Sequence, residues 1–233
     1  MKLPLLISVP HGGLDVPREV AGLSILTPEQ VVKDGDVGAA EIYSFAEEVE
    51  VFVAAETARA FVDLNRAEND RTQDGVVKTH TCWNEPVYRS PLDEECVEQM
   101  LASYHRPYHE RLTALAGSPI RLGIDCHTMA AHGPPVGPDP GEERPWVCLS
   151  NANQTCPAGW MDALARCFAC SFGREPSINK PFTGGYITRI HASEMPWVQL
   201  ELSRAPFMTL TEKRDCVLRG LQSWCHWLES TLN

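Results

Sequence analysis

Short apolar runs alternate along this chain with longer segments of helical periodicity, and this alternation constrains the fold more than any other feature. Runs rich in β-branched and apolar residues predict strands, whereas apolar residues three or four positions apart predict helices. We expect strands at residues 5–9, 49–55, 60–64, 120–126, 146–149, 186–190 and 197–202, and helices at 27–48, 90–117, 155–172 and 211–228. The order predicts an α/β fold in which helices sandwich a mixed sheet.

Two of the predicted helices begin with capping residues. Residues 27–30 (TPEQ) combine a capping threonine, a proline at the first helical position and a glutamine three residues after the cap. Residues 90–93 (SPLD) repeat the pattern at the start of the second helix. Gly35 and Gly38 weaken the first helix, and Pro107 is expected to kink the second.

The composition is that of an ordinary globular protein with an acidic surface. With 43% hydrophobic and 22% charged residues and no Ser/Gly-rich linker, we expect a single domain over residues 1–233. The formal net charge of -11 argues against a nucleic-acid partner, which requires clustered lysines and arginines. A small anionic substrate would have to be held by arginines placed locally.

The sequence gives no sign of export or of membrane insertion. The apolar start of the chain is preceded by a single charged residue, Lys2, and ends at Pro10, which is not the pattern of a cleavable signal peptide. No apolar run reaches the length of a membrane span. The nine cysteines are odd in number and lack framework spacing, so we expect reduced thiols and a cytoplasmic protein.

Polar residues cluster where predicted strands end. The clusters lie at residues 10–13 (PHGG), 63–66 (DLNR), 125–128 (DCHT) and 199–204 (QLELSR). Ligands of open α/β sheets gather beside the carboxyl ends of strands, so these clusters are candidates for a common site. His11 and His127, each just past a predicted strand, could bind one zinc ion with a carboxylate as third ligand and an open position for water.

These clusters, taken in order, resemble the motifs of the N-formylglutamate amidohydrolase family. The matching segments are PHGG at 10–13, DLNR at 63–66, Asp-x-His at 125–127, GGYIxR at 184–189 and Gln-x-Glu at 199–201. No single motif is specific, but five in this order are, and they span nearly the whole chain. The resemblance implies hydrolysis of an N-acyl amino acid, with N-formylglutamate as the first expectation.

A more distant similarity links the chain to aspartoacylase and the zinc carboxypeptidases. It implies a zinc-exopeptidase-like fold and one Zn²⁺ per chain, held by His11 and His127. Those relatives use His-x-x-Glu, but the residue three after His11 is Leu14, which cannot coordinate a metal. The third ligand is therefore open among Asp15, Asp34 and Asp36, and we prefer Asp36.

Glu201 is the candidate general base. Alternation along its strand places it on the face opposite Leu200 and Leu202, and a carboxylate within a strand needs a partner or a task. A structural salt bridge to Arg204 is the alternative task. The family's glutamate at this position accepts a proton from the attacking water, and the resemblance assigns that role to Glu201.

The resemblance also distributes roles among other polar residues. Arg66 and Arg189, with Asn65, are expected to bind the substrate's carboxylates, and Arg59 is expected to stabilise the oxyanion. A metal-bound histidine usually donates its second N–H to a carboxylate or carbonyl, so Asp63 is expected to orient His11. Asp125, two residues before the second histidine, is assigned the same supporting role.

Two further patterns are discounted. His105 and His109 lie on one predicted helical face without the glutamate of His-Glu-x-x-His, so we expect them to line a helix surface. Cys167 and Cys170 lie within a predicted helix rather than at its start, so packing is the expected use. The rival hypotheses are another N-acyl amino acid deacylase, a carboxypeptidase-like hydrolase, a non-catalytic metal- or metabolite-binding module, and a thiol redox protein.

Overall fold

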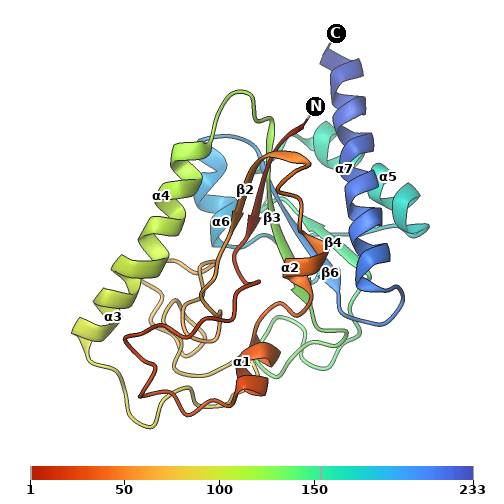
Figure 1. Cartoon of the computed structure of the whole chain (residues 1–233). Coiled ribbons are helices and arrows are strands. Elements are labelled where there is room, and N and C mark those ends of the chain that lie inside the picture. Colours follow the sequence, from red (N-terminus) through yellow and green to blue (C-terminus); the bar gives the residue numbers. More distant parts are fainter. Residues whose placement is uncertain (1, 153, 233) are drawn as a thin grey trace.

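A computed structural model describes residues 2–152 and 154–232 and contains one six-stranded sheet (Figure 1). The strands are β1 (Leu3–Val9), β2 (Val49–Ala54), β3 (Leu122–Met129), β4 (Val147–Ser150), β5 (Ser177–Ile178) and β6 (Trp197–Ser203). They lie in the order β2-β1-β3-β6-β4-β5, with every neighbouring pair parallel except β4 and β6. The mixed sheet that the alternating pattern predicted is confirmed.

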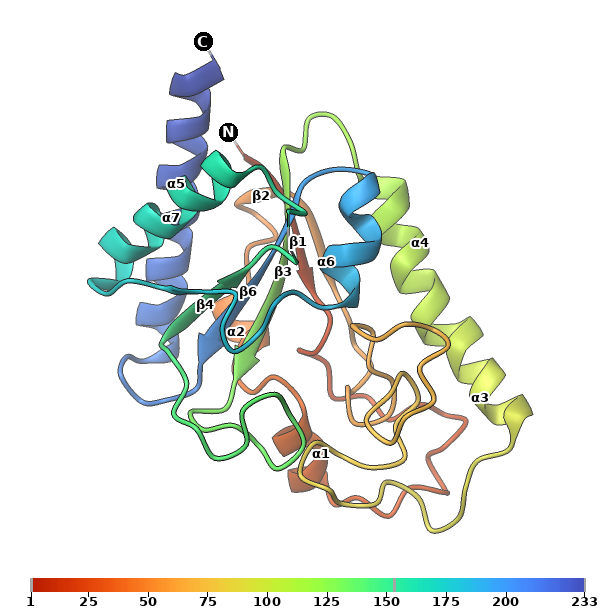
Figure 2. The ribbon, with the colours of Figure 1, turned by 180° about the vertical axis from the view of Figure 1, so that it is seen from behind.

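Helices cover both faces of this sheet, as the two opposite views show (Figures 1 and 2). One face carries α2 (Ala39–Ile42), α5 (Ala158–Phe172) and α7 (Leu210–Leu232). The other carries α3 (Glu94–Met100), a π-helical turn (Leu101–His105), α4 (Arg106–Leu115), α6 (Tyr186–Ile190) and a 3₁₀ turn (His191–Ser193). Helix α1 (Pro28–Asp34) lies beyond the carboxyl ends of the parallel strands. None of the helices in the described part of the chain is long and apolar enough to cross a membrane.

The single helix predicted over residues 27–48 is wrong, because the chain breaks it in the middle. The predicted cap is present: the Thr27 side chain accepts a hydrogen bond from the Gln30 backbone, and the Gln30 side chain accepts one from the Thr27 backbone. The helix ends at Asp34, and Gly38 has φ 83°, which a glycine adopts without steric cost. The break turns the chain back, so that the Asp36 backbone N–H donates to the His11 carbonyl at 3.1 Å.

The second predicted helix is continuous but irregular. Its cap is Asp93, whose side chain accepts from the Cys96 backbone at 2.8 Å, rather than Ser90. The π-helical turn ends at His105, two residues before Pro107. Proline has no N–H to donate to the preceding turn, which accounts for an irregular turn at this place instead of a break.

Two predicted strands are not strands. Residues 60–64 form a buried turn with one bridge, between Val62 and Val77, because the loop packs its apolar side chains without a strand partner. Residues 186–190 form helix α6, whose first turn is held by the Asn65 side chain, which accepts from the Ile187 backbone at 2.8 Å. In both segments tertiary contacts override an apolar or β-branched composition that favours a strand.

Candidate active site

The register of β3 and β6 places four polar side chains on one face of the sheet. Asp125 pairs with Gln199 and His127 with Glu201, and residues opposite each other on neighbouring strands point to the same face. Their apolar neighbours in sequence face the helices α5 and α7. His127 therefore lies within β3, not beyond it as the sequence suggested, because the strand extends to Met129.

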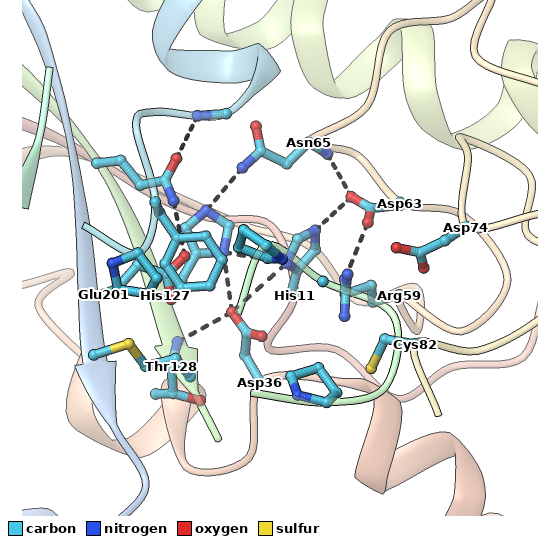
Figure 3. Close-up of a pocket in the computed structure, with 18 of the residues that line it drawn as sticks. His11, Asp36, Arg59, Asp63, Asn65, Asp74, Cys82, His127, Thr128 and Glu201 are labelled. Atoms are coloured by element: carbon cyan, nitrogen blue, oxygen red, sulfur yellow. Dashed lines mark hydrogen bonds and ion pairs between the residues drawn. The ribbon is translucent and has the colours of Figure 1, made fainter. Parts of the chain in front are cut away.

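Three side chains from three segments converge at the carboxyl ends of β1 and β3 (Figure 3). The Nδ1 atoms of His11 and His127 lie 3.1 Å apart. The Asp36 Oδ2 atom lies 3.0 Å from His127 Nδ1 and 3.6 Å from His11 Nδ1. All three side chains are nearly inaccessible to solvent. The loop between α1 and α2 thus delivers a carboxylate to two histidines that are far apart in sequence.

The opposite ring nitrogen of each histidine faces a carboxylate. His11 Nε2 lies 2.8 Å from Asp63 Oδ1, and His127 Nε2 lies 2.9 Å from Asp125 Oδ2. A carboxylate accepts a hydrogen bond, so each Nε2 is the protonated nitrogen. Both Nδ1 atoms are then directed at Asp36 and at each other.

The electrostatics of this cluster are set by burial and by its carboxylates. Burial lowers the pKa of His11, but Asp63 and Asp36 outweigh burial and leave that pKa above its ordinary value. Burial also disfavours protonated His127, yet Asp125 and Asp36 hold its pKa well above the ordinary value. Burial raises the pKa of Asp36, but its contacts with the two histidines lower it overall. The site therefore favours positive charge between the carboxylates.

The geometry of the three ligand atoms fits a zinc ion. They all lie within 4.8 Å of one another. Ligands about 2.0–2.1 Å from a tetrahedral zinc ion lie about 3.3 Å apart, close to the separations of His11, Asp36 and His127. Three protein ligands and one open position are typical of catalytic zinc sites.

The structure separates the three candidates for the third ligand. Asp36 lies between the histidines, whereas Asp34 pairs with the buried ammonium group of Lys78 at 2.8 Å. Asp15 is exposed and does not line the cavity. Among the three aspartates, only Asp36 brings an oxygen to the imidazole nitrogens.

Glu201 lines the same cavity as the two histidines and Asp36, and one of its carboxylate oxygens accepts a hydrogen bond. Its Oε1 accepts a hydrogen bond from the Gln199 amide at 2.8 Å, and the Gln199 carbonyl in turn accepts from the Gly185 backbone. Burial raises the pKa of Glu201 above its ordinary value, although His127 opposes this shift. No ion pair joins Glu201 to Arg204 in the described residues, so the alternative salt bridge is absent there.

Asn65 connects the turn at residues 63–66 to the rest of the site. Its Nδ2 lies 3.1 Å from His127 Nε2, while its Oδ1 accepts from the Ile187 backbone. Gly185 lies against this amide, and a Cβ atom there would come within 2.2 Å of Asn65 Nδ2. Only glycine permits this approach, so Gly185 of the GGYIxR segment has a packing role.

These groups line a cavity of about 330 Å³. Arg59 borders it and is fixed on two sides: its Nε donates to Asp63 at 3.0 Å and its Nη1 to the Asp34 carbonyl at 2.9 Å. Arg66 also borders it, with 40% of its side chain exposed. Arg189 is exposed, donates to the Thr183 hydroxyl and does not line the cavity, so the structure does not bring it to the site.

Two arginines that the sequence analysis did not assign to substrate also line the cavity. Arg144 comes from the loop before β4, and Arg204 directly follows β6. Arg204 was considered only as a partner of Glu201, and the Pro/Gly-rich loop that carries Arg144 gives no pattern that places it. The position of Arg204 three residues after Glu201 was the available signal.

The expectation that His105 and His109 line a helix surface is wrong. His105 is buried, and its Nε2 donates to the Arg66 carbonyl at 2.9 Å. His109 Nε2 donates to the Leu64 carbonyl at 3.0 Å, and His109 Nδ1 lies 2.9 Å from His191 Nε2. The two helical donors fix the carbonyls on both sides of residue 65, and hence the turn that carries the site's polar residues.

The nine cysteines are all free thiols. Cys167 packs against the core beside α7, whereas Cys170 is exposed, so the expected packing role applies to the first alone. Neither lines the cavity.

The mixed sheet, helices on both faces and a polar cavity at the carboxyl ends of its parallel strands define an α/β protein with its site at the usual position for this class. A sequence profile of the N-formylglutamate amidohydrolase family matches residues 3–208. The chain belongs to this family and is an amidohydrolase.

Individual relatives agree with this assignment. The chain is 29% identical over 231 residues to an N-formylglutamate deformylase of Pseudomonas putida, an alignment that covers 91% of this chain and 84% of the relative. The crystal structure of an N-formylglutamate amidohydrolase from Ralstonia eutropha superposes with a TM-score of 0.78 at 20% identity, covering 99% of this chain and 95% of that one. A gene product of Agrobacterium tumefaciens gives a TM-score of 0.76 at 16% identity, covering 100% and 91%. Both structures share the fold.

Proposed function

We propose that this protein hydrolyses the amide bond of N-formyl amino acids, with N-formylglutamate as the preferred substrate, and that it uses one zinc ion held by His11, Asp36 and His127. The observation that carries the proposal is the convergence of these three side chains beside Glu201. A zinc ion there would act as a Lewis acid toward the formyl oxygen and water. The family assignment and the names of the relatives support the substrate.

The protein's own residues supply the proton chemistry. Glu201 accepts the proton of the attacking water and returns it to the leaving nitrogen, a role favoured by a pKa that burial raises toward neutrality. Gln199 holds one oxygen of this carboxylate, which leaves the other free for the proton. Arg59, fixed by Asp63, faces the cavity as the candidate stabiliser of the oxyanion.

Substrate anchoring is assigned to arginines at the cavity. Arg66 borders the cavity and has donors left after pairing with Asp74, so we assign it to a substrate carboxylate. Asn65, assigned with it from the family motif, uses its Oδ1 to accept from the Ile187 backbone and orients the turn. Arg189 would have to leave Thr183 to reach the cavity.

The test combines substrate, metal and one substitution. Zinc-loaded protein should release formate from N-formylglutamate, and Glu201→Gln should lower turnover by at least about a hundredfold while keeping the metal. Glu50→Gln, at an exposed carboxylate of β2, is the matched control. Parallel assays with N-acetylglutamate and a dipeptide separate a deformylase from other amidohydrolases. Unchanged turnover in Glu201→Gln would remove Glu201 from the reaction.

A further inference from the structure

Four arginines line the cavity, and three of them already have a carboxylate partner. The pairs, all at 3.0 Å or less, are Arg59 with Asp63, Arg66 with Asp74, and Arg144 with Asp139. Arg204 has no carboxylate within 4.0 Å among residues 2–152 and 154–232. Within the described cavity it is the guanidinium whose charge is not balanced by a direct ion pair.

The position of Arg204 is fixed by the backbone around it. Its own N–H donates to the Met129 carbonyl at 2.8 Å, which joins it to the end of β3. Its Nη1 donates to the Gly35 carbonyl at 3.1 Å, next to Asp36. Its Nε is buried and has no hydrogen-bond partner. A guanidinium has five N–H donors in a rigid fork, and the Gly35 carbonyl accepts from one of them, so donors on the terminal nitrogens remain for a ligand.

A partly buried guanidinium without a carboxylate partner is unusual unless a ligand supplies the anion. Burial lowers the pKa of Arg204, although the nearby Asp36 favours the charged form. Arginine still stays charged in proteins, so the folded chain carries a partly desolvated cation without a direct counter-ion. A carboxylate that accepted from the terminal nitrogens would balance this charge.

We propose that Arg204 binds an anionic group of the substrate, most simply a second carboxylate. The assignment rests on the proposed function for the identity of the substrate, but the anion site itself does not. Arg66 is left for the other carboxylate, so the two arginines together select a dicarboxylic acyl amino acid. Arg204 thereby takes the place that the family motif gave to Arg189, which lies outside the cavity.

The alternative is that Arg204 merely braces the Gly35 carbonyl and so keeps Asp36 in place. The two roles differ in which ligands would bind more weakly after Arg204 is substituted. Loss of a brace would weaken metal binding and would affect every ligand alike. Loss of an anion site would affect a ligand that carries the second carboxylate and spare its neutral isostere.

The experiment measures binding of glutarate and of its monoamide to zinc-loaded protein by calorimetry. The wild type should bind glutarate at least about tenfold more tightly, and Arg204→Gln should bring the ratio of the two affinities close to one. Arg204→Lys keeps the charge but loses the fork, so it should recover only part of the ratio. Arg89→Gln, at an exposed arginine that does not line the cavity, should leave the ratio unchanged.

Several results would overturn the inference. They are a wild-type ratio near one, an unchanged ratio in Arg204→Gln, and an equal loss for both ligands accompanied by loss of zinc. If Arg204→Gln does not fold, the ratio in Arg204→Lys decides: a ratio equal to that of the wild type contradicts the proposal. Hydrolysis of N-formylglutamate by the wild type is assayed separately, so a missing activity with an intact binding ratio refutes the proposed function and not the anion site.

Discussion

Four of the eight histidines form two groups, and the groups differ in the atoms that accept from their Nε2–H groups. In the cavity, His11 and His127 donate to carboxylates, whose charge outweighs burial and raises both pKa values. Beneath the neighbouring turn, His105 and His109 donate to neutral carbonyls. There burial dominates, and it lowers the pKa of His109 to about 3.

The group that accepts from Nε2–H therefore determines whether a histidine here can bind a metal or only supports the fold. An imidazole whose Nε2–H donates to a carboxylate presents a more basic Nδ1 to a cation. A buried imidazole that donates to a carbonyl remains neutral and holds that carbonyl in place. The second group also supports the first, because it fixes the Leu64 and Arg66 carbonyls on either side of the turn that carries Asn65.

The largest expected difference between the groups is in metal content. His11→Gln and His127→Gln should each lose zinc and hydrolysis, with a fall in zinc affinity beyond the roughly 100-fold that follows loss of an outer partner. His109→Gln should keep the metal. Zinc per chain after dialysis, with circular dichroism as the check on folding, makes the measurement. Stoichiometric zinc in either cavity variant would show that the substituted histidine is not a metal ligand.

A smaller effect is expected from the carboxylate that distinguishes the groups. Asp125→Asn leaves the ligands in place but replaces the charge facing His127 Nε2, so zinc affinity should fall about 10- to 100-fold. Competition with a coloured chelator measures it. Asp162→Asn, at an exposed position of α5, is the control. An affinity equal to that of the control would mean that the carboxylate does not tune the imidazole.

The smallest effect should be a pH dependence of stability. The pKa of His109 is lower in the folded chain than its ordinary 6.5, so the unfolded chain binds more protons between about pH 3 and 6.5. The free energy of unfolding therefore falls as the pH drops through this window. Between pH 7.5 and 5.5 the wild type should lose about 1 kcal/mol more than His109→Gln, which cannot ionise.

Urea unfolding of both proteins at the two pH values tests this, because changes at other groups are common to both. Parallel stability curves for the wild type and the variant would show that His109 is not held neutral by burial.

Much of the architecture followed from periodicity. Strands β1, β2, β3, β4 and β6 and helices α5 and α7 lie where apolar runs and helical spacing predicted them, because each buries its apolar side chains against a continuous layer. Local signals failed at residues 60–64 and 186–190. Both segments are rich in apolar or β-branched residues, but neither has a strand edge to pair with.

The site divides in the same way. The sequence by itself determined which residue types gather at strand ends. It also determined that Asp125 shares a face of the sheet with His127, and Gln199 with Glu201, since side chains two residues apart on a strand point to the same face. The sequence also left Asp36 as one of three candidates for the third metal ligand. Only the tertiary structure showed that Asp36, and not Asp15 or Asp34, lies beside the two histidines, and that Arg204 lines the cavity whereas Arg189 does not, because these positions depend on how loops fold back over the sheet. Loop paths follow from long-range contacts such as that of the Asp36 backbone with the His11 carbonyl, which no local pattern encodes.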